Sequence, residues 1–236
     1  MSGTLFPLAP LLPAAASAAM GRVRVCDVGA LSLGENEDVY TPLQRQGLCD
    51  VVGFEPVPGE CERLNADATR SSTPGGPQMR FLPTFVGDGK PGCFRLCSAP
   101  MTSSLFEPNT KLLQRFHGIA ELCEVVSRSE VTTATLDSLQ EDLGPIDFLK
   151  IDVQGGELAV IEGATEVLKG VSVVEVEVEF VELYQAQPLF ADVDAALRAR
   201  GFVFHRFSSL QGRCMKPLSV KGNPYVRPSP PSSPTE

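Results

Sequence analysis

The chain has 236 residues, 43% of them hydrophobic and 21% charged, which is typical of a globular domain with one substantial core. Its net charge of -9 and pI of about 4.8 argue against a nucleic-acid partner. An acidic chain repels a phosphate backbone unless its basic residues form a cluster, and the few basic residues here do not. The seven cysteines are odd in number and lack zinc-finger spacing, which predicts reduced thiols, no metal site and a cytoplasmic location.

Residues 1–21 are expected to form a disordered leader before the folded domain. No charged side chain precedes Arg22, whereas a secretory signal would begin with a basic region. Pro7, Pro10 and Pro13 interrupt its apolar residues, so no run reaches the roughly 18 residues of a membrane span. The small residues around Ala18 leave a targeting role open as an alternative.

Strands and helices alternate after the leader, which is typical of an α/β domain with a parallel sheet. The first strand is predicted at Val23–Val28 and the second at Asp50–Glu55. Between them, a helix is expected to begin with Thr41 as its cap and Pro42 at its first position, and to stop at Gly47. A second helix follows that contains Glu60, Cys61, Leu64 and Asn65.

The middle of the chain is predicted to contain shorter elements. A third strand at Arg80–Val86 leads through a turn at Gly87–Lys90 into a hairpin return at Cys93–Cys97. Met101–Asn109 is rich in polar and turn residues and is expected to form a loop near the functional site. Glu130–Leu139 is predicted to be a short strand that runs into a helix.

The segment Ile146–Leu158 is the most informative part of the chain. Its uniformly apolar start predicts a central strand covered on both sides, and Asp152 follows at the carboxyl edge, where such sheets bind ligands. Gly155 allows a sharp turn, and Glu157 lies in the first turn of the next helix, where an acid is favoured. A plain capping role for Asp152 stays open as the alternative.

A helix over Glu157–Lys169 and a strand over Ser172–Val181 are predicted next. In this strand, valines occupy one face and Glu175, Glu177 and Glu179 the other. Three carboxylates are costly to bury side by side, so this face is either solvated or borders a cavity that needs acids.

The last elements are a helix at Pro188–Arg200, ended by Gly201, and a strand at Phe202–Phe207. The chain then becomes rich in proline and serine, so residues 219–236 are expected to be disordered. The folded domain is therefore expected to span residues 22–218.

Acids at the strand ends point to a nucleoside cofactor. Glu55 lies 21 positions after Gly34, at the end of the second strand, where a carboxylate can bind the ribose of either NAD or S-adenosylmethionine. The glycine pattern after the first strand is incomplete, and the helix that follows contains a proline, which is unfavourable for a pyrophosphate. S-adenosylmethionine is therefore favoured, with an NAD-dependent oxidoreductase kept as the less favoured alternative.

Six motifs in order carry a resemblance to a known family: DVGA at residues 27–30, GFEP at 53–56, SSLFEPN at 103–109, TLDSL at 135–139, LKIDVQGGEL at 149–158 and EVEFVELYQAQPLF at 177–190. On these residues, the chain resembles the FkbM-type S-adenosylmethionine-dependent methyltransferases. The resemblance implies a Rossmann-like class I methyltransferase fold. It also implies methyl transfer to a hydroxyl of a sugar or other small molecule.

The resemblance also implies roles for individual residues. Asp27, Gly29 and Ala30 would line the cofactor loop, Glu55 would hold the ribose, and Asp152 would face the methionine end or the acceptor and take the hydroxyl proton. Asp88 could approach the adenine, although a plain turn aspartate is the alternative. Glu157 and Glu177 are further catalytic candidates. The alternative for Glu157 is an acid at a helix start, and the alternative for Glu177 is a solvated strand face.

The chain departs from the family after Arg206. No apolar run there can form the antiparallel strand that normally closes the sheet, so the sheet is predicted to lack it. A second function follows as an alternative, a methyltransferase-like binding domain with weak or no turnover.

Overall fold

The computed structural model describes residues 21–31, 38–72 and 74–218. Residues 1–20 of the leader expected over residues 1–21, Gly34, and the tail expected from residue 219 lie outside the described residues. Within the described part of the chain, none of the helices combines the length and the apolar character that crossing a membrane requires.

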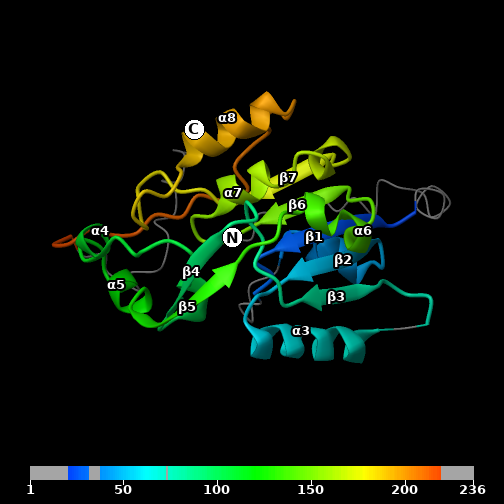
Figure 1. Cartoon of the computed structure of the whole chain (residues 1–236), viewed down its shortest axis with the longest axis horizontal. Helices are drawn as coiled ribbons and strands as arrows, with labels where there is room; N and C mark the ends of the chain where they lie inside the picture. Colours follow the sequence, from blue (N-terminus) through cyan, green and yellow to red (C-terminus); the bar gives the residue numbers. More distant parts are fainter. Residues whose placement is uncertain (1–20, 32–37, 73, 219–236) are drawn as a thin grey trace, which may run out of the picture.

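A five-stranded, wholly parallel sheet forms the centre of the molecule (Figure 1). Its strand order is β3-β2-β1-β6-β7, so the α/β prediction is confirmed. In space, the strands are β3 (Met79–Leu82), β2 (Cys49–Phe54), β1 (Val23–Val28), β6 (Phe148–Ile151) and β7 (Val173–Val176). Because all five strands run the same way, their carboxyl ends meet at one edge of the sheet.

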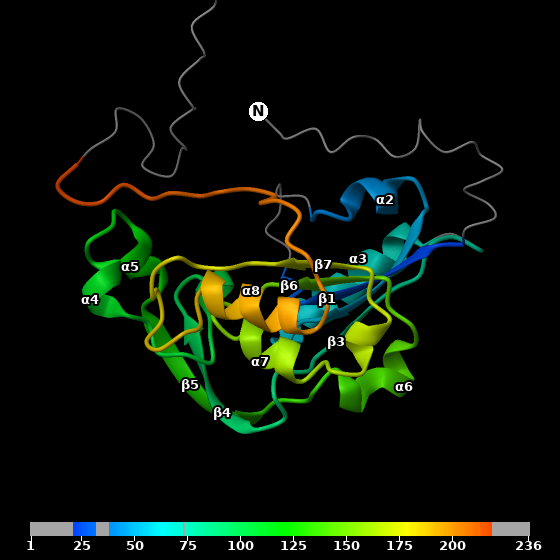
Figure 2. The same ribbon diagram turned by 90° about the horizontal axis from the view of Figure 1, so that it is seen from above.

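Helices cover the two faces of the sheet unequally (Figure 2). The main core fills one face, where it packs against α6 (Gln140–Leu143), α7 (Glu157–Glu162) and α8 (Phe190–Ala199). On the other face, α2 (Thr41–Arg45) and α3 (Pro58–Ser71) pack against β1, β2 and β3. The side chains of β6 and β7 on this second face line a cavity instead: Phe148, Lys150, Val173 and Glu175.

A small antiparallel sheet lies beside the carboxyl edge of the main one (Figure 1). It pairs β4 (Pro91–Cys97) with β5 (Val125–Thr132), so the predicted hairpin between Cys93–Cys97 and the third strand is wrong. Strand β3 ends at Leu82, before Pro83, and Val86 makes only an isolated parallel bridge with Ala134. The short helices near this sheet are η1 (Pro100–Thr102), α4 (Thr110–Leu113), α5 (Ile119–Leu122) and, after β5, η2 (Asp137–Leu139).

The helix predicted over Glu157–Lys169 is interrupted. It stops after Glu162 with Gly163 as its C-cap, and Gly163 packs directly against the backbone, since a Cβ there would lie 2.3 Å from the Gly87 carbonyl oxygen. A separate turn, η3 (Val167–Lys169), follows. Its start is fixed by Asp137, whose carboxylate accepts hydrogen bonds from two backbone amides, those of residues 166 and 167, at 2.9–3.0 Å.

The strand predicted at Phe202–Phe207 is wrong, since these residues form no regular element and pair with no strand among the described residues. Their chain leaves α8 and continues to the α4–α5 region, where Met215 forms an isolated bridge with Phe116. Strand β7 is therefore the edge of the main sheet, and no antiparallel strand closes that sheet within the described residues, as predicted. The segment from residue 203 to residue 218 is called the C-terminal segment below.

Candidate active site

A cavity of about 1580 Å³ lies at the carboxyl edge of the main sheet and extends onto the open face of β6 and β7. Its wall includes five of the predicted site residues: Gly29, Glu55, Asp88, Asp152 and Glu177. The predicted residues outside the lining are Asp27, Ala30 and Glu157. The loop that contains η1 and residues 103–106 borders the cavity, as expected for the segment Met101–Asn109.

The turn after β1 lies tightly against the end of β6. Gly29 has a φ of +86°, and a Cβ at this position would be 1.8 Å from the Asp152 carbonyl oxygen. The amides of Gly29 and Ala30 both donate to the Phe54 carbonyl at 3.0 Å, which fixes the turn to the end of β2 as well. Only glycine allows this approach, so the ends of three strands meet at one point.

Asp27 is fully buried within the sheet and does not face the cavity. One carboxylate oxygen accepts from Lys150 Nζ at 2.9 Å and the other from the Tyr40 hydroxyl at 2.7 Å. Lys150 also pairs with Asp38 at 3.3 Å. Burial raises the pKa of Asp27, and the ammonium of Lys150 opposes this rise. The geometry thus gives Asp27 a role in holding β1 to β6.

Glu55 ends β2 and is buried in the cavity wall, where its Oε1 accepts from the Val57 amide at 2.8 Å. Burial raises the pKa of this carboxyl. Asp88 borders the same cavity from the turn that precedes β4. Its carboxylate binds the amide and the ammonium of Lys90, which lowers its pKa. Asp88 therefore both forms the expected turn and faces the cavity.

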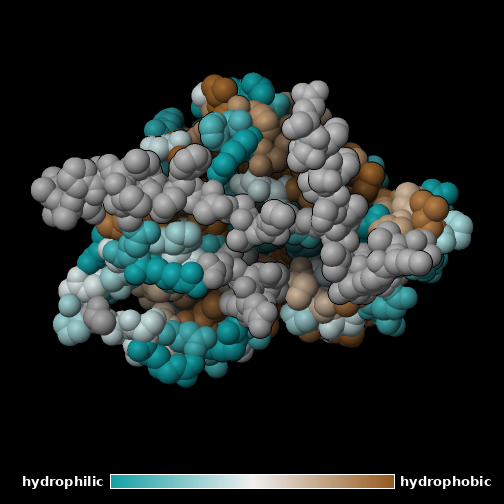
Figure 3. Space-filling view, turned by 180° about the vertical axis from the view of Figure 1, so that it is seen from behind, coloured by the Kyte–Doolittle hydropathy of each residue, from teal (hydrophilic) through white to brown (hydrophobic). Residues whose placement is uncertain are grey.

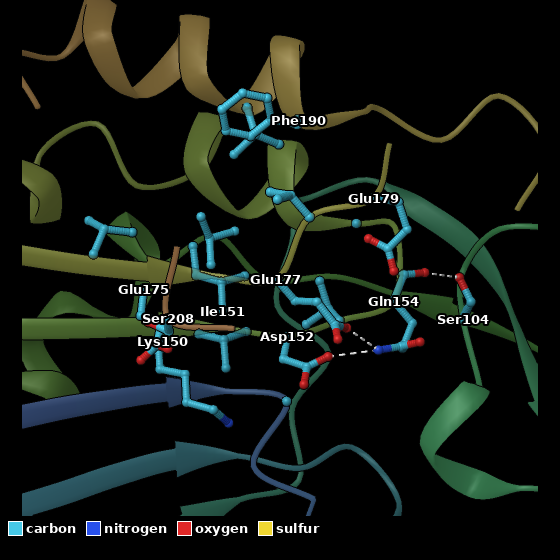
Figure 4. Close-up of a pocket in the computed structure, with 18 of the residues that line it drawn as sticks. Ser104, Lys150, Ile151, Asp152, Gln154, Glu175, Glu177, Glu179, Phe190 and Ser208 are labelled. Atoms are coloured by element: carbon cyan, nitrogen blue, oxygen red, sulfur yellow. Dashed lines mark hydrogen bonds between the residues drawn. The ribbon is translucent and has the colours of Figure 1, made fainter. Parts of the chain in front are cut away.

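Gln154 joins two acids across the cavity floor (Figure 4). Its side-chain amide donates to Asp152 Oδ1 at 2.8 Å and also to Glu177 Oε2. The Gln154 backbone has a φ of 57°, which is rare for a residue with a side chain, and is held there by a hydrogen bond of 2.6 Å from the Ser104 hydroxyl to the Gln154 carbonyl. Tyr184 donates to the Gln154 side-chain oxygen at 3.3 Å.

The three glutamates of β7 and the residues after it border this cavity, and the Glu177 side chain stays partly accessible to solvent, so both alternatives for this strand face remain open. Loss of solvent raises the pKa of Glu177, and the carboxylate of Asp152 raises it further. The pKa of Glu179 rises for the same two reasons.

The model of the Methyltransferase FkbM domain matches residues 27–204, three quarters of the chain. The chain belongs to the FkbM methyltransferase family. Comparisons with curated proteins and with solved structures found no match. The resemblance read from the six motifs is confirmed, and membership supports methyltransferase activity with a small-molecule acceptor.

In this FkbM-family chain, Glu157 supports the site from behind. Its buried carboxylate accepts from the amides of Val153 and Gly155 at 3.0–3.1 Å, and burial raises its pKa to about 7. This geometry favours a structural role, and its catalytic role stays a prediction. Asp152 does not cap α7, because that helix begins after Gly156 without a side-chain cap.

Three residues were not predicted as site residues: Gln154, which contacts the acids, and Ser104 and Tyr184, which both donate hydrogen bonds to Gln154. All three lie within the family motifs, in SSLFEPN, LKIDVQGGEL and EVEFVELYQAQPLF. Their positions within the motifs could have identified them as site residues. The acids were predicted from their charge, which these three neutral side chains lack.

Proposed function

We propose that the chain is an S-adenosylmethionine-dependent methyltransferase that acts on a hydroxyl of a small molecule or sugar. The observation that carries this proposal is the meeting of Gly29, Glu55 and Asp152 around one cavity at the ends of adjacent strands. In open parallel sheets, this is where ligands bind. The acids Glu55 and Asp152, on either side of the tight turn at Gly29, suit a nucleoside that carries a positive charge.

The residues of the wall fit this cofactor by their chemistry. The Gly29 turn borders the cavity with its backbone, Glu55 would accept hydrogen bonds from ribose hydroxyls, and Asp88 would meet the adenine edge. Asp152 would face the methionine end. When bound, S-adenosylmethionine supplies an electrophilic methyl group. No phosphate has to be held, which agrees with the absence of a complete glycine-rich loop from the sequence.

Asp152 is the base in this proposal. It takes the proton that the acceptor hydroxyl loses as its oxygen gains the methyl group. Gln154 keeps Asp152 oriented through its 2.8 Å hydrogen bond. Burial and the neighbouring charge of Asp152 raise the pKa of Glu177, which favours the protonated form of Glu177 beside an ionised Asp152. Rate acceleration comes mainly from holding the two reacting groups in line.

Calorimetric titration with S-adenosylmethionine and, in parallel, with NAD tests the cofactor. We expect binding of the first and none of the second. Release of S-adenosylhomocysteine is then measured with a panel of sugars and hydroxylated small molecules. Binding of NAD alone would contradict the proposal, and binding of S-adenosylmethionine without release for any acceptor would favour a binding domain.

A further inference from the structure

Four phenylalanine rings form a cluster beside the acids of the cavity, called the four-ring cluster below: Phe180, Phe190, Phe204 and Phe207. Neighbouring ring centroids lie 4.9–5.9 Å apart in tilted and edge-to-face arrangements. The rings come from three parts of the chain, namely the residues after β7, the start of α8 and the C-terminal segment. Such packing is the favourable geometry for aromatic side chains.

The cluster is exposed although it is apolar. Phe180, Phe204 and Phe207 keep 56%, 42% and 40% of their surface accessible. In the view from behind, hydrophobic residues show near the top of the molecule, over α8 and the chain that follows it (Figure 3). Large rings that remain exposed together mark a binding surface more often than a packing fault.

All four rings line the cavity that also contains Asp152 and Glu177. Figure 4 shows Phe190 between helix α8 and the glutamates of the β7 region. The Phe190 amide donates to the Glu179 backbone carbonyl at 2.9 Å, so the residue that carries this ring is bonded directly to the segment that carries the acids. An apolar platform and a group of carboxyls therefore adjoin within one cavity, which is the usual composition of a small-molecule site.

The position of the cluster depends on a part of the chain that the family match does not cover. The match ends at residue 204, and Phe207 lies beyond it. The far end of the C-terminal segment is held by backbone hydrogen bonds from His117 to Cys214 and from Lys216 to Arg115, at 3.3 and 2.7 Å. Between the end of α8 and this anchored end, Phe204 and Phe207 form part of the cavity wall.

We propose that the four-ring cluster is the subsite for an apolar ring of the methyl acceptor, an inference that rests on the proposed function. The acceptor is then a small amphiphile that directs its hydroxyl to Asp152 and its ring to the phenylalanines. An aromatic ring gains edge-to-face contacts with these side chains beyond simple burial. An unsubstituted sugar would leave the rings in water, so it is the poorer acceptor.

Binding of 2-naphthol tests the subsite without any need for turnover. The chain contains no tryptophan, so the fluorescence of the naphthol ring can be followed directly. We expect the double substitution Phe204→Ala and Phe207→Ala to raise the dissociation constant about tenfold. Phe207→Leu, which keeps an apolar side chain but removes the ring, should raise it less. Val126→Ala, an exposed apolar position on β5 outside the cavity, is the control and should change nothing.

Thermal unfolding of each variant first establishes that it folds, and Phe207→Leu serves where the double variant does not. The same samples are titrated with S-adenosylmethionine, so loss of cofactor binding is distinguished from loss of the subsite. Methyl transfer to 2-naphthol should show a raised KM in the ring variants, while transfer to methyl glucoside should not. Equal affinity for naphthol in the wild type and the double variant would overturn the subsite and leave the proposed function standing.

Other occupants of the cluster are separate outcomes of the test. Sedimentation that shows a dimer in the wild type and a monomer in the double variant, with no naphthol binding, would assign the cluster to a second copy. Retention on phosphatidylcholine vesicles that the double variant loses, again with no naphthol binding, would assign it to a lipid surface. Either result would overturn the acceptor subsite.

Discussion

The carboxyl ends of β1 and β6 each carry an aspartate, in opposite surroundings. Asp27 is buried between Lys150 and Tyr40, and both of its oxygens are bound. Asp152 lies in the cavity, accepts from a neutral amide and faces Glu177. Among the described residues, no ion pair includes Asp152. The carboxylate of Asp27 is enclosed by a cation and a hydroxyl, whereas that of Asp152 lies in the cavity beside another acid, within range of the Lys150 charge but free of a direct ion pair, and is available for proton transfer.

The largest expected effect concerns the paired aspartate. Lys150→Met removes the cation and leaves Asp27 charged in the interior, so the free energy of unfolding should fall by about 3–5 kcal/mol. Denaturant unfolding measures this loss. Adding Asp27→Asn should recover part of it, because the remaining amide no longer carries a buried charge.

Lys169→Met is the matched control, since Lys169 pairs with Glu166 on the surface of η3. An exposed pair contributes less than about 1 kcal/mol, so this variant should unfold almost as the wild type does. If Lys150→Met proved as mild as Lys169→Met, Asp27 would not depend on its cation, and the contrast with Asp152 would fail.

Asp152→Asn tests the other half of the comparison. Removal of the base should lower kcat about 100-fold or more, while the affinity for S-adenosylmethionine changes less. Asp67→Asn is the control, because Asp67 pairs only with surface arginines on α3. Steady-state kinetics and calorimetry on the same samples separate the two effects. Undiminished turnover with unchanged cofactor affinity would refute the assignment of the base.

Much of the sheet could be predicted because local patterns determine it. The apolar runs of β1, β2 and β6 identify buried parallel strands, and the acids after them identify the edge that bears the cavity. The partner of β4 could not be predicted in this way. Its pairing with β5 joins residues such as Cys93 and Glu130 across three short helices, and local periodicity carries no information about such a distant partner.

The candidate site shows the same division. The sequence places Asp27 and Asp152 alike after apolar strands, but the partner of Asp27 is 123 positions away. Only the register of β1 against β6, which sets Asp27 beside Lys150, reveals that one acid is neutralised. The conformation of Gln154 likewise depends on Ser104, 50 positions earlier. The strand expected at Phe202–Phe207 fails because its rings join the four-ring cluster instead of an edge.

Glu157 sharpens the comparison as a third acid, buried like Asp27 but held by backbone amides instead of a cation. Glu157→Gln retains one acceptor oxygen and turns an N–H group toward the amides of Val153 and Gly155. The free energy of unfolding at neutral pH should fall by about 1–3 kcal/mol, the usual cost of leaving buried polar groups unsatisfied. Chemical denaturation at pH 7.5 measures this fall.

The pH dependence of the same variant has a definite sign. In the wild type, the pKa of Glu157 is about 7 in the folded protein, against an ordinary value of 4.5 for a glutamate in the unfolded chain. The folded state therefore holds a proton that the unfolded chain has released, so stability falls as the pH rises from about 4.5 to about 7. This fall should be shallower in Glu157→Gln and unchanged in Glu166→Gln, an exposed control. An identical slope in Glu157→Gln would show that this carboxyl is ionised in the fold, and the amides alone would then stabilise a buried charge as well as Lys150 does at Asp27.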